Sequence, residues 1–77
     1  MVVLYSAQGC HLCDRARAVL DAEGAVYTEV DITGDPALEA AYREWIPVVE
    51  IDGERAFVYH VQPVGLRRKL EAQSRDD

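Results

Sequence analysis

Cys10-His11-Leu12-Cys13 follows the apolar run Val2-Val3-Leu4-Tyr5 after a short loop and stands at the beginning of a helical pattern. The chain has no other cysteines, and this spacing puts the two thiols about one helical turn apart. A helix N-terminus presents unpaired backbone N–H groups and the positive end of the helix dipole, so a cysteine there is favoured as the thiolate, the form that attacks disulfides. The stretch therefore favours redox chemistry through a reversible dithiol.

An amphipathic helix follows the cysteines and is predicted over residues 11–23. Its apolar residues recur at helical spacing, and Gly24 supplies the stop; they are Leu12, Ala16, Val19 and Leu20. Residues 26–32 then alternate between apolar and polar side chains, the period of a half-buried strand. With residues 2–5 as a central strand, this order gives a strand–helix–strand unit, whose strands we expect to be parallel with a right-handed crossover.

A second helix is predicted from Asp35-Pro36, which supplies an N-cap and a first helical residue. Its apolar stripe ends with Tyr42 and Trp45, so we expect the helix to end near residue 44 or 45, with both aromatic residues in the core or forming a groove wall. Pro47 biases the preceding residue toward an extended conformation, and a strand continues over residues 48–51.

Asp52-Gly53 is the strongest turn signal of the chain. This dipeptide favours positive φ at both central positions of a two-residue turn, so residues 48–51 should pair antiparallel with about residues 55–59. Gln62-Pro63 opens a last helix. We expect one domain over residues 1–72 and a frayed tail over residues 73–77.

Length and charge exclude several classes of protein. The 77 residues allow one core, and the net charge of −6 disfavours nucleic acid and anionic membranes as partners. No stretch approaches the ~18 apolar residues of a membrane span, and the start of the chain lacks a basic leader, so we expect a cytoplasmic protein. In that reducing compartment a lone Cys-x-x-Cys pair is seldom a permanent structural bridge.

The expected order is β-α-β-α-β-β-α, an α/β fold with a four-stranded mixed sheet and helices on both faces. With Cys-x-x-Cys between the first strand and first helix, and Ile46-Pro47 before the third strand, the chain resembles the thioredoxin fold. It is most similar to the glutaredoxins, and among them to the small bacterial glutaredoxin-like proteins. The resemblance is carried by residues 4–20 and by Ile46-Pro47-Val48-Val49.

The resemblance implies a thiol–disulfide oxidoreductase in which Cys10 attacks and Cys13 resolves the mixed disulfide. Position along the helix favours the same roles, because Cys10 lies nearer the loop and should be the more exposed and more acidic thiol. The resemblance also implies that Pro47 is cis and faces the cysteines, with the backbone at Ile46 free to pair with an extended substrate. His11 and Leu12 complete the expected substrate-binding residues.

Three departures from the glutaredoxin pattern leave the substrate open. His11-Leu12 replaces the usual Pro-Tyr, Ala7 replaces a basic residue, and Tyr59-His60-Val61-Gln62 replaces a Gly-Gly segment that contacts glutathione. We expect no bound cofactor, and glutathione or another low-molecular-weight thiol as reductant. The expected partners are a disulfide-containing protein or a small thiol, and a thiol reductase. We expect the protein itself to be a monomer.

Two alternatives use the same residues differently. One is a metal or iron–sulfur carrier, although a tetrahedral site needs four ligands and His11, between the cysteines, cannot easily turn toward the same ion as they do. His60 is the only other histidine, so we assign no metal ligands; a dimer sharing one ion or cluster would avoid this objection. The other alternative is a thioredoxin-fold adaptor whose dithiol is silent.

Overall fold

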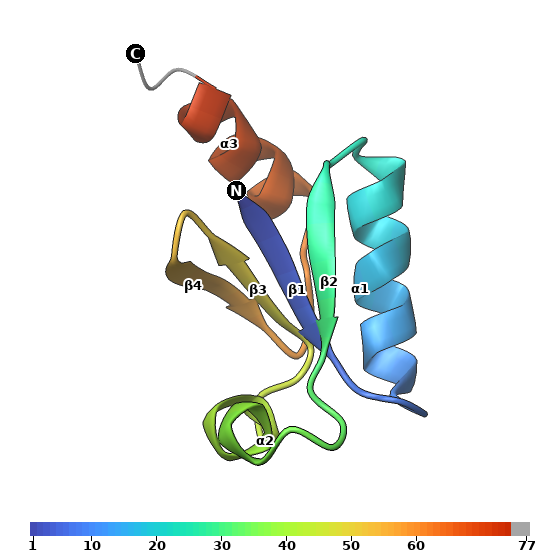
Figure 1. Ribbon diagram of the computed structural model, residues 1–77. Coiled ribbons are helices and arrows are strands. Elements are labelled where there is room, and N and C mark those ends of the chain that lie inside the picture. The colour runs from blue at the N-terminus through green and yellow to red at the C-terminus, as the bar shows by residue number, and fades with distance from the viewer. Residues whose placement is uncertain (75–77) are drawn as a thin grey trace.

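The computed structural model describes residues 1–74, which form one four-stranded sheet and three helices (Figure 1). The elements in chain order are β1 (Val2–Ser6), α1 (His11–Ala22), β2 (Tyr27–Asp31), α2 (Pro36–Tyr42), β3 (Val48–Ile51), β4 (Glu54–Val58) and α3 (Pro63–Ser74). The strand order is β2-β1-β3-β4, with β1 parallel to β2, and with β3 antiparallel to both β1 and β4. The β-α-β-α-β-β-α order and the mixed sheet expected from the sequence are confirmed.

Helices α1 and α3 cover one face of the sheet and enclose the main core. The buried members of this core come from both helices, from the strands and from the segment before α3; they are Val2, Leu4, Ala16, Leu20, Val49, Val61 and Leu66. Helix α2 lies on the opposite face, because the Tyr42 ring stacks on Tyr5 at a centroid distance of 4.0 Å, and Tyr5 points away from its neighbour Leu4.

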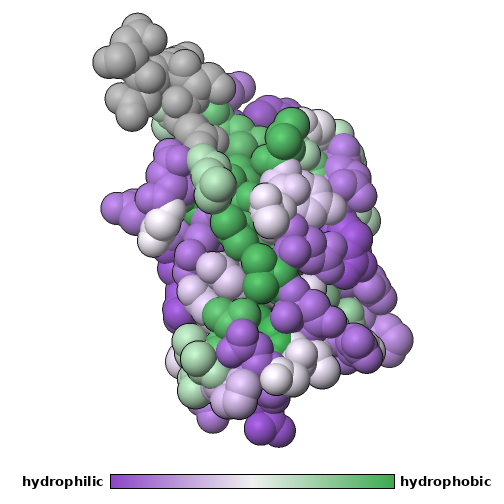
Figure 2. Space-filling view, in the orientation of Figure 1, coloured by the Kyte–Doolittle hydropathy of each residue, from purple (hydrophilic) through white to green (hydrophobic). Residues whose placement is uncertain are grey.

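The face that bears α2 is only partly covered. Helix α2 buries none of its own residues and lies near the end of the sheet where β1 and β2 finish (Figure 1). Figure 2 shows a strip of hydrophobic residues crossing the side turned to the viewer, with hydrophilic residues along both margins. The well-packed core of this small domain therefore lies on the side of α1 and α3.

The hairpin between β3 and β4 turns on Asp52 and Gly53, as predicted. Their φ values of 52° and 83° are the positive angles that a two-residue turn of this kind requires. Ile51 pairs with Glu54 across the turn, and the ladder has an irregularity between Val49 and Glu50. The observed strand β4 begins one residue earlier than expected.

The prediction for the end of the second helix was wrong. Helix α2 ends at Tyr42, and Trp45 is 42% exposed, which excludes the core as its place but not a groove wall. The Trp45 N–H donates to the Tyr42 carbonyl at 2.8 Å, within the turn that carries the chain toward β3. Because residues 43–45 leave the helix, the helical spacing that placed Trp45 on the apolar stripe no longer applies there.

Two further boundaries differ from the prediction. Helix α1 ends at Ala22, one residue early, and β2 begins at Tyr27 while Val26 is 91% exposed. Tyr27 packs against the main core, so Glu29, two residues further along the strand, lies on the same face as α1. At the other end, α3 continues through Ser74, two residues into the expected tail; residues 75–77 of that tail lie outside the described residues.

Candidate dithiol site

The start of α1 is built around Cys10. Cys10 is the N-cap, with extended backbone angles of −91° and 107°, and its Sγ accepts a hydrogen bond of 3.1 Å from the Cys13 N–H. A disulfide joins the two residues, whose Cα atoms lie 5.2 Å apart, within the usual range for such bonds. Gly9, at φ 75°, makes the turn from the loop into this cap.

The two sulfur-bearing residues differ in burial. Cys13 is 1% exposed, on the inner face of α1, whereas Cys10 is only half-buried at the helix start. This agrees with the expected difference in access between the two thiols. Cys10 is thus accessible to a molecule that approaches from solvent, whereas Cys13 is shielded from it.

The peptide bond between Ile46 and Pro47 is cis, as the resemblance implied. Tyr5 of β1 is paired with Val48 of β3, so Pro47 lies at the end of the sheet from which β1 leads to Cys10. Pro47 is buried and Ile46 is half-buried. The fold thus brings this loop and the dithiol to one end of the sheet; the direction in which the Pro47 ring faces stays a prediction.

The histidines do not join the dithiol in a metal site. His11 is exposed at the first position of α1 beside half-buried Leu12, and His60 is exposed beyond β4. Within the described part of the chain, no group of three or more His, Cys, Asp and Glu side chains is placed to hold a metal ion. Likewise, no described helix combines the length and the hydropathy that a membrane span requires.

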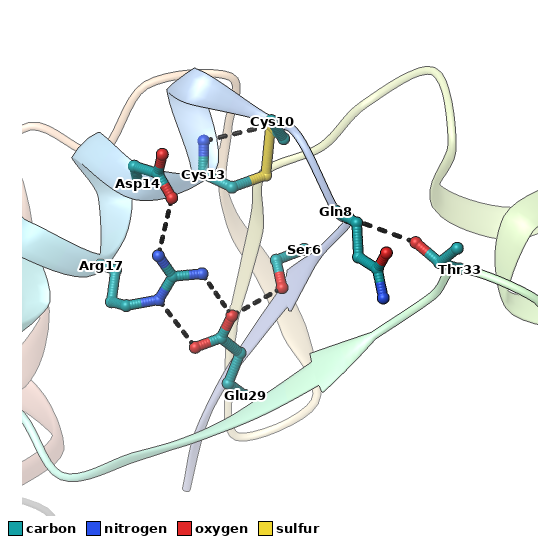
Figure 3. The surroundings of a disulfide bond; sticks show 8 residues. All are labelled: Ser6, Gln8, Cys10, Cys13, Asp14, Arg17, Glu29 and Thr33. Atoms are coloured by element: carbon teal, nitrogen blue, oxygen red, sulfur yellow. Dashed lines mark hydrogen bonds and ion pairs between the residues drawn. A yellow bond between two sulfur atoms is a disulfide. The ribbon is translucent and has the colours of Figure 1, made fainter.

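A polar cluster that the sequence did not predict lies beside the disulfide (Figure 3). We call Ser6, Asp14, Arg17 and Glu29 the Arg17 cluster. The Arg17 guanidinium donates to both Glu29 oxygens at 2.9 and 2.5 Å and to Asp14 Oδ1 at 2.9 Å. The Ser6 hydroxyl, buried at the end of β1, donates to Glu29 Oε2 at 2.8 Å. The cluster therefore joins the first turns of α1 to β1 and β2.

These contacts keep the cluster charged. Hydrogen bonding from Arg17 lowers the pKa of Glu29, with a smaller contribution from Ser6, and partial burial opposes them. Hydrogen bonds to Glu29 and then Asp14 raise the pKa of Arg17. The i,i+3 spacing of Asp14 and Arg17 was a signal in the sequence, but nothing local linked Arg17 to Glu29.

An aromatic pair, Trp45 and Tyr59, lies beside the Ile46–Pro47 loop. Tyr59 has the positive φ of 64°, its N–H donates to the Pro47 carbonyl at 3.0 Å, and its hydroxyl donates to the Glu44 carbonyl at 2.8 Å. The centre of its ring lies 6.1 Å from that of Trp45, and both residues are about two-fifths exposed. A bulky side chain thus stands beside Pro47 where the glutaredoxin pattern would place glycines.

These features define a thioredoxin-fold protein of the dithiol type: a mixed sheet with this strand order, and a Cys-x-x-Cys disulfide at the start of the first helix. The chain belongs to the glutaredoxin-like domain family (DUF836), whose sequence profile matches residues 1–71. No curated protein matches the chain.

Solved structures agree with this assignment. The X-ray structure of protein XcR50 from X. campestris is 34% identical, with a TM-score of 0.83 over 94% of this chain and 97% of that one. A point mutant of the thioredoxin-like protein BC3987 is 25% identical, with a TM-score of 0.70 over 91% and 99% of the two chains. A buckwheat glutaredoxin–glutathione complex shares the fold at 22% identity and a TM-score of 0.64, over 94% of this chain and 69% of that one.

Proposed function

We propose that this protein is a thiol–disulfide oxidoreductase that reduces disulfides of proteins or of low-molecular-weight thiols. The observation that supports the proposal is the Cys10–Cys13 disulfide itself, with one partly accessible sulfur at a helix start and one buried sulfur behind it. The helix N-terminus favours the thiolate at Cys10, and burial protects Cys13 from competing reactions.

The reaction begins from the reduced protein. The Cys10 thiolate attacks one sulfur of the substrate disulfide, a new S–S bond joins Cys10 to the substrate, and the other substrate sulfur leaves as a thiolate. Cys13, deprotonated, then attacks Cys10 Sγ, which forms the Cys10–Cys13 disulfide and releases the second substrate thiol. Two electrons pass to the substrate, and its two sulfurs take up two protons from the cysteines or from water.

The return half of the cycle needs an external thiol. Two small thiols such as glutathione, or the dithiol of a reductase, attack the Cys10–Cys13 disulfide and are themselves oxidised to a disulfide. We propose that the protein acts as a monomer with no bound cofactor. Ile46, Pro47, His11 and Leu12 are the residues we propose to contact the substrate. His11 and Leu12 directly follow Cys10 in the chain, and the Ile46–Pro47 loop lies at the same end of the sheet.

The activated thiol is tested with a Cys13→Ser variant, which leaves Cys10 as the only thiol. The rate of Cys10 alkylation by iodoacetamide, measured against pH, should give an apparent pKa below the ~8.5 of free cysteine. A pKa of 8.5 or above would remove the physical basis for Cys10 as the attacking group.

Turnover is tested with the full chain. Oxidised protein is supplied with NADPH and either glutathione plus its reductase or thioredoxin reductase, with a small-molecule disulfide as substrate. We expect one system to sustain NADPH oxidation that Cys10→Ser abolishes. If neither system reduces the protein and a strong dithiol reductant does not open the disulfide of the folded chain, the oxidoreductase proposal is wrong and the silent adaptor is favoured.

A further inference from the structure

The Arg17 cluster surrounds the first turns of the helix that carries the dithiol. Asp14 directly follows Cys13, and Arg17 lies one helical turn beyond Cys13, so both belong to the start of α1. Glu29 comes from β2, and Figure 3 shows it beneath the disulfide together with Ser6. Since Asp14 adjoins Cys13 in the chain and is hydrogen-bonded to Arg17, the charge of the cluster lies at the same end of α1 as the two sulfurs.

The charges of this cluster do not cancel. One guanidinium, that of Arg17, lies between two carboxylates, those of Asp14 and Glu29, and makes three hydrogen bonds to them. The cluster thus carries a net negative charge. Without Arg17, both carboxylates would stand uncompensated beside the helix start.

Reduction of the disulfide creates negative charge at the same place. The disulfide is neutral, whereas the reduced pair holds a thiolate at the N-terminus of α1 whenever the attacking thiol is ionised. Carboxylates nearby oppose that charge, and a guanidinium favours it. The balance of charge in the cluster must then affect the equilibrium between disulfide and dithiol.

We infer that Arg17 is a positioning residue that compensates the carboxylates of Asp14 and Glu29 and thereby sets how readily the Cys10–Cys13 disulfide is reduced. The inference rests on the proposed function and adds that the charges of the Arg17 cluster control the equilibrium between disulfide and dithiol. The reaction concerned is the reduction of the disulfide by two thiols of glutathione. The S–S bond of the protein breaks, one forms in oxidised glutathione, and two electrons pass to Cys10 and Cys13, which keep or release the accompanying protons.

The experiment equilibrates the wild type, Arg17→Gln and Glu29→Gln with graded ratios of reduced to oxidised glutathione at pH 8, and measures the fraction of free thiol. Arg17→Gln should make the disulfide about threefold harder to reduce, and Glu29→Gln about threefold easier, which is the order of effect expected for one nearby unit charge in a largely aqueous, partly screened setting. Arg17→Lys, which keeps the charge, should remain near the wild type. Raising the salt from 10 mM to 0.5 M should reduce both shifts.

A matched ion pair provides the control. Arg67 of α3 donates to both carboxylate oxygens of Glu23, at the opposite end of α1 from the dithiol. Arg67→Gln and Glu23→Gln remove the same kinds of charge and should leave the equilibrium unchanged.

The outcomes separate this inference from the proposed function. Suppose that the wild type equilibrates with glutathione, but Arg17→Gln and Glu29→Gln shift the equilibrium between disulfide and dithiol in the same direction. The cluster then only stabilises the local structure, and the inference is overturned. If both variants are folded and neither shifts the equilibrium between disulfide and dithiol, the inference is overturned as well. A wild-type disulfide that exchanges with no thiol reagent overturns both the inference and the proposed function.

Discussion

The stability of the reduced protein is the sharpest test of whether the Cys10–Cys13 disulfide is a reversible or a structural bond. The bond closes a loop with a sequence separation of 3. In the chain-entropy description, so short a loop stabilises the folded state by about 2 kcal/mol. A thiolate at the helix N-terminus of the reduced protein restores roughly 0.3–1 kcal/mol through the helix dipole. Reduction should therefore lower the free energy of unfolding by about 1–2 kcal/mol.

That loss is small against the whole domain. A chain of 77 residues is expected to have a free energy of unfolding of about 4–12 kcal/mol, so the dithiol form should stay folded. The measurement is urea unfolding followed by far-UV circular dichroism, with and without dithiothreitol. With a slope of about 1 kcal/mol per M, the midpoint should fall by roughly 1–2 M on reduction.

A double variant, Cys10→Ser with Cys13→Ser, is the control. It lacks the thiolate as well as the disulfide, so it should unfold roughly 0.3–1 M of urea below the midpoint of the reduced wild type and show no response to dithiothreitol. A reduced protein that is unfolded in buffer, or that loses more than about 4 kcal/mol, would show that the bond is structural and that the entropic reasoning is wrong.

Three further predictions concern the fold around the site. Leu20→Ala should lower the free energy of unfolding by about 3–5 kcal/mol because Leu20 is fully buried in the main core, whereas Val26→Ala should change it by less than ~0.5 kcal/mol; equal urea midpoints would contradict the assigned core. Because the pKa of Glu29 is lowered in the folded state, its contribution should be present above pH ~4.5 and lost as the pH falls through that lowered value. The melting temperatures of the wild type and Glu29→Gln should thus differ at pH 7, and the difference should shrink as the pH falls below ~4.5; a difference that does not change with pH refutes the assignment. Gly53→Ala, at φ 83°, should destabilise the hairpin by about 1–2 kcal/mol in the same urea assay, and no change would contradict the turn geometry.

Features fixed by near neighbours were predictable from the sequence. Asp35 caps α2 with Pro36 at its first position, as expected, and its side chain accepts from the N–H groups of Ala37 and Leu38. The Asp52–Gly53 turn follows from the backbone preferences of two adjacent residues. In the same way, Cys10 and Cys13 were identified as a pair because three residues of helix set their separation.

Features that depend on distant contacts were not predictable. Ser6 is 23 residues from Glu29 and Arg17 is 12 residues from it, and no pattern within either segment links them. The register of β2 against β1 decides that Glu29 faces α1, and alternation alone does not choose the face. The end of α2 was misjudged because the helical pattern continues to Trp45 in the sequence, whereas the backbone leaves the helix after Tyr42.

The hydrogen bond from the Cys13 N–H to Cys10 Sγ gives the sulfur a second role, that of helix cap. In the proposed cycle Cys10 is in turn a thiolate, half of a mixed disulfide and half of an internal disulfide, and in all three states its sulfur can accept that bond. The hydrogen bond that caps α1 therefore need not be lost as the sulfur passes from one state to the next. A serine at this position would retain the cap and lose the chemistry, so Cys10→Ser separates the two roles in a single substitution.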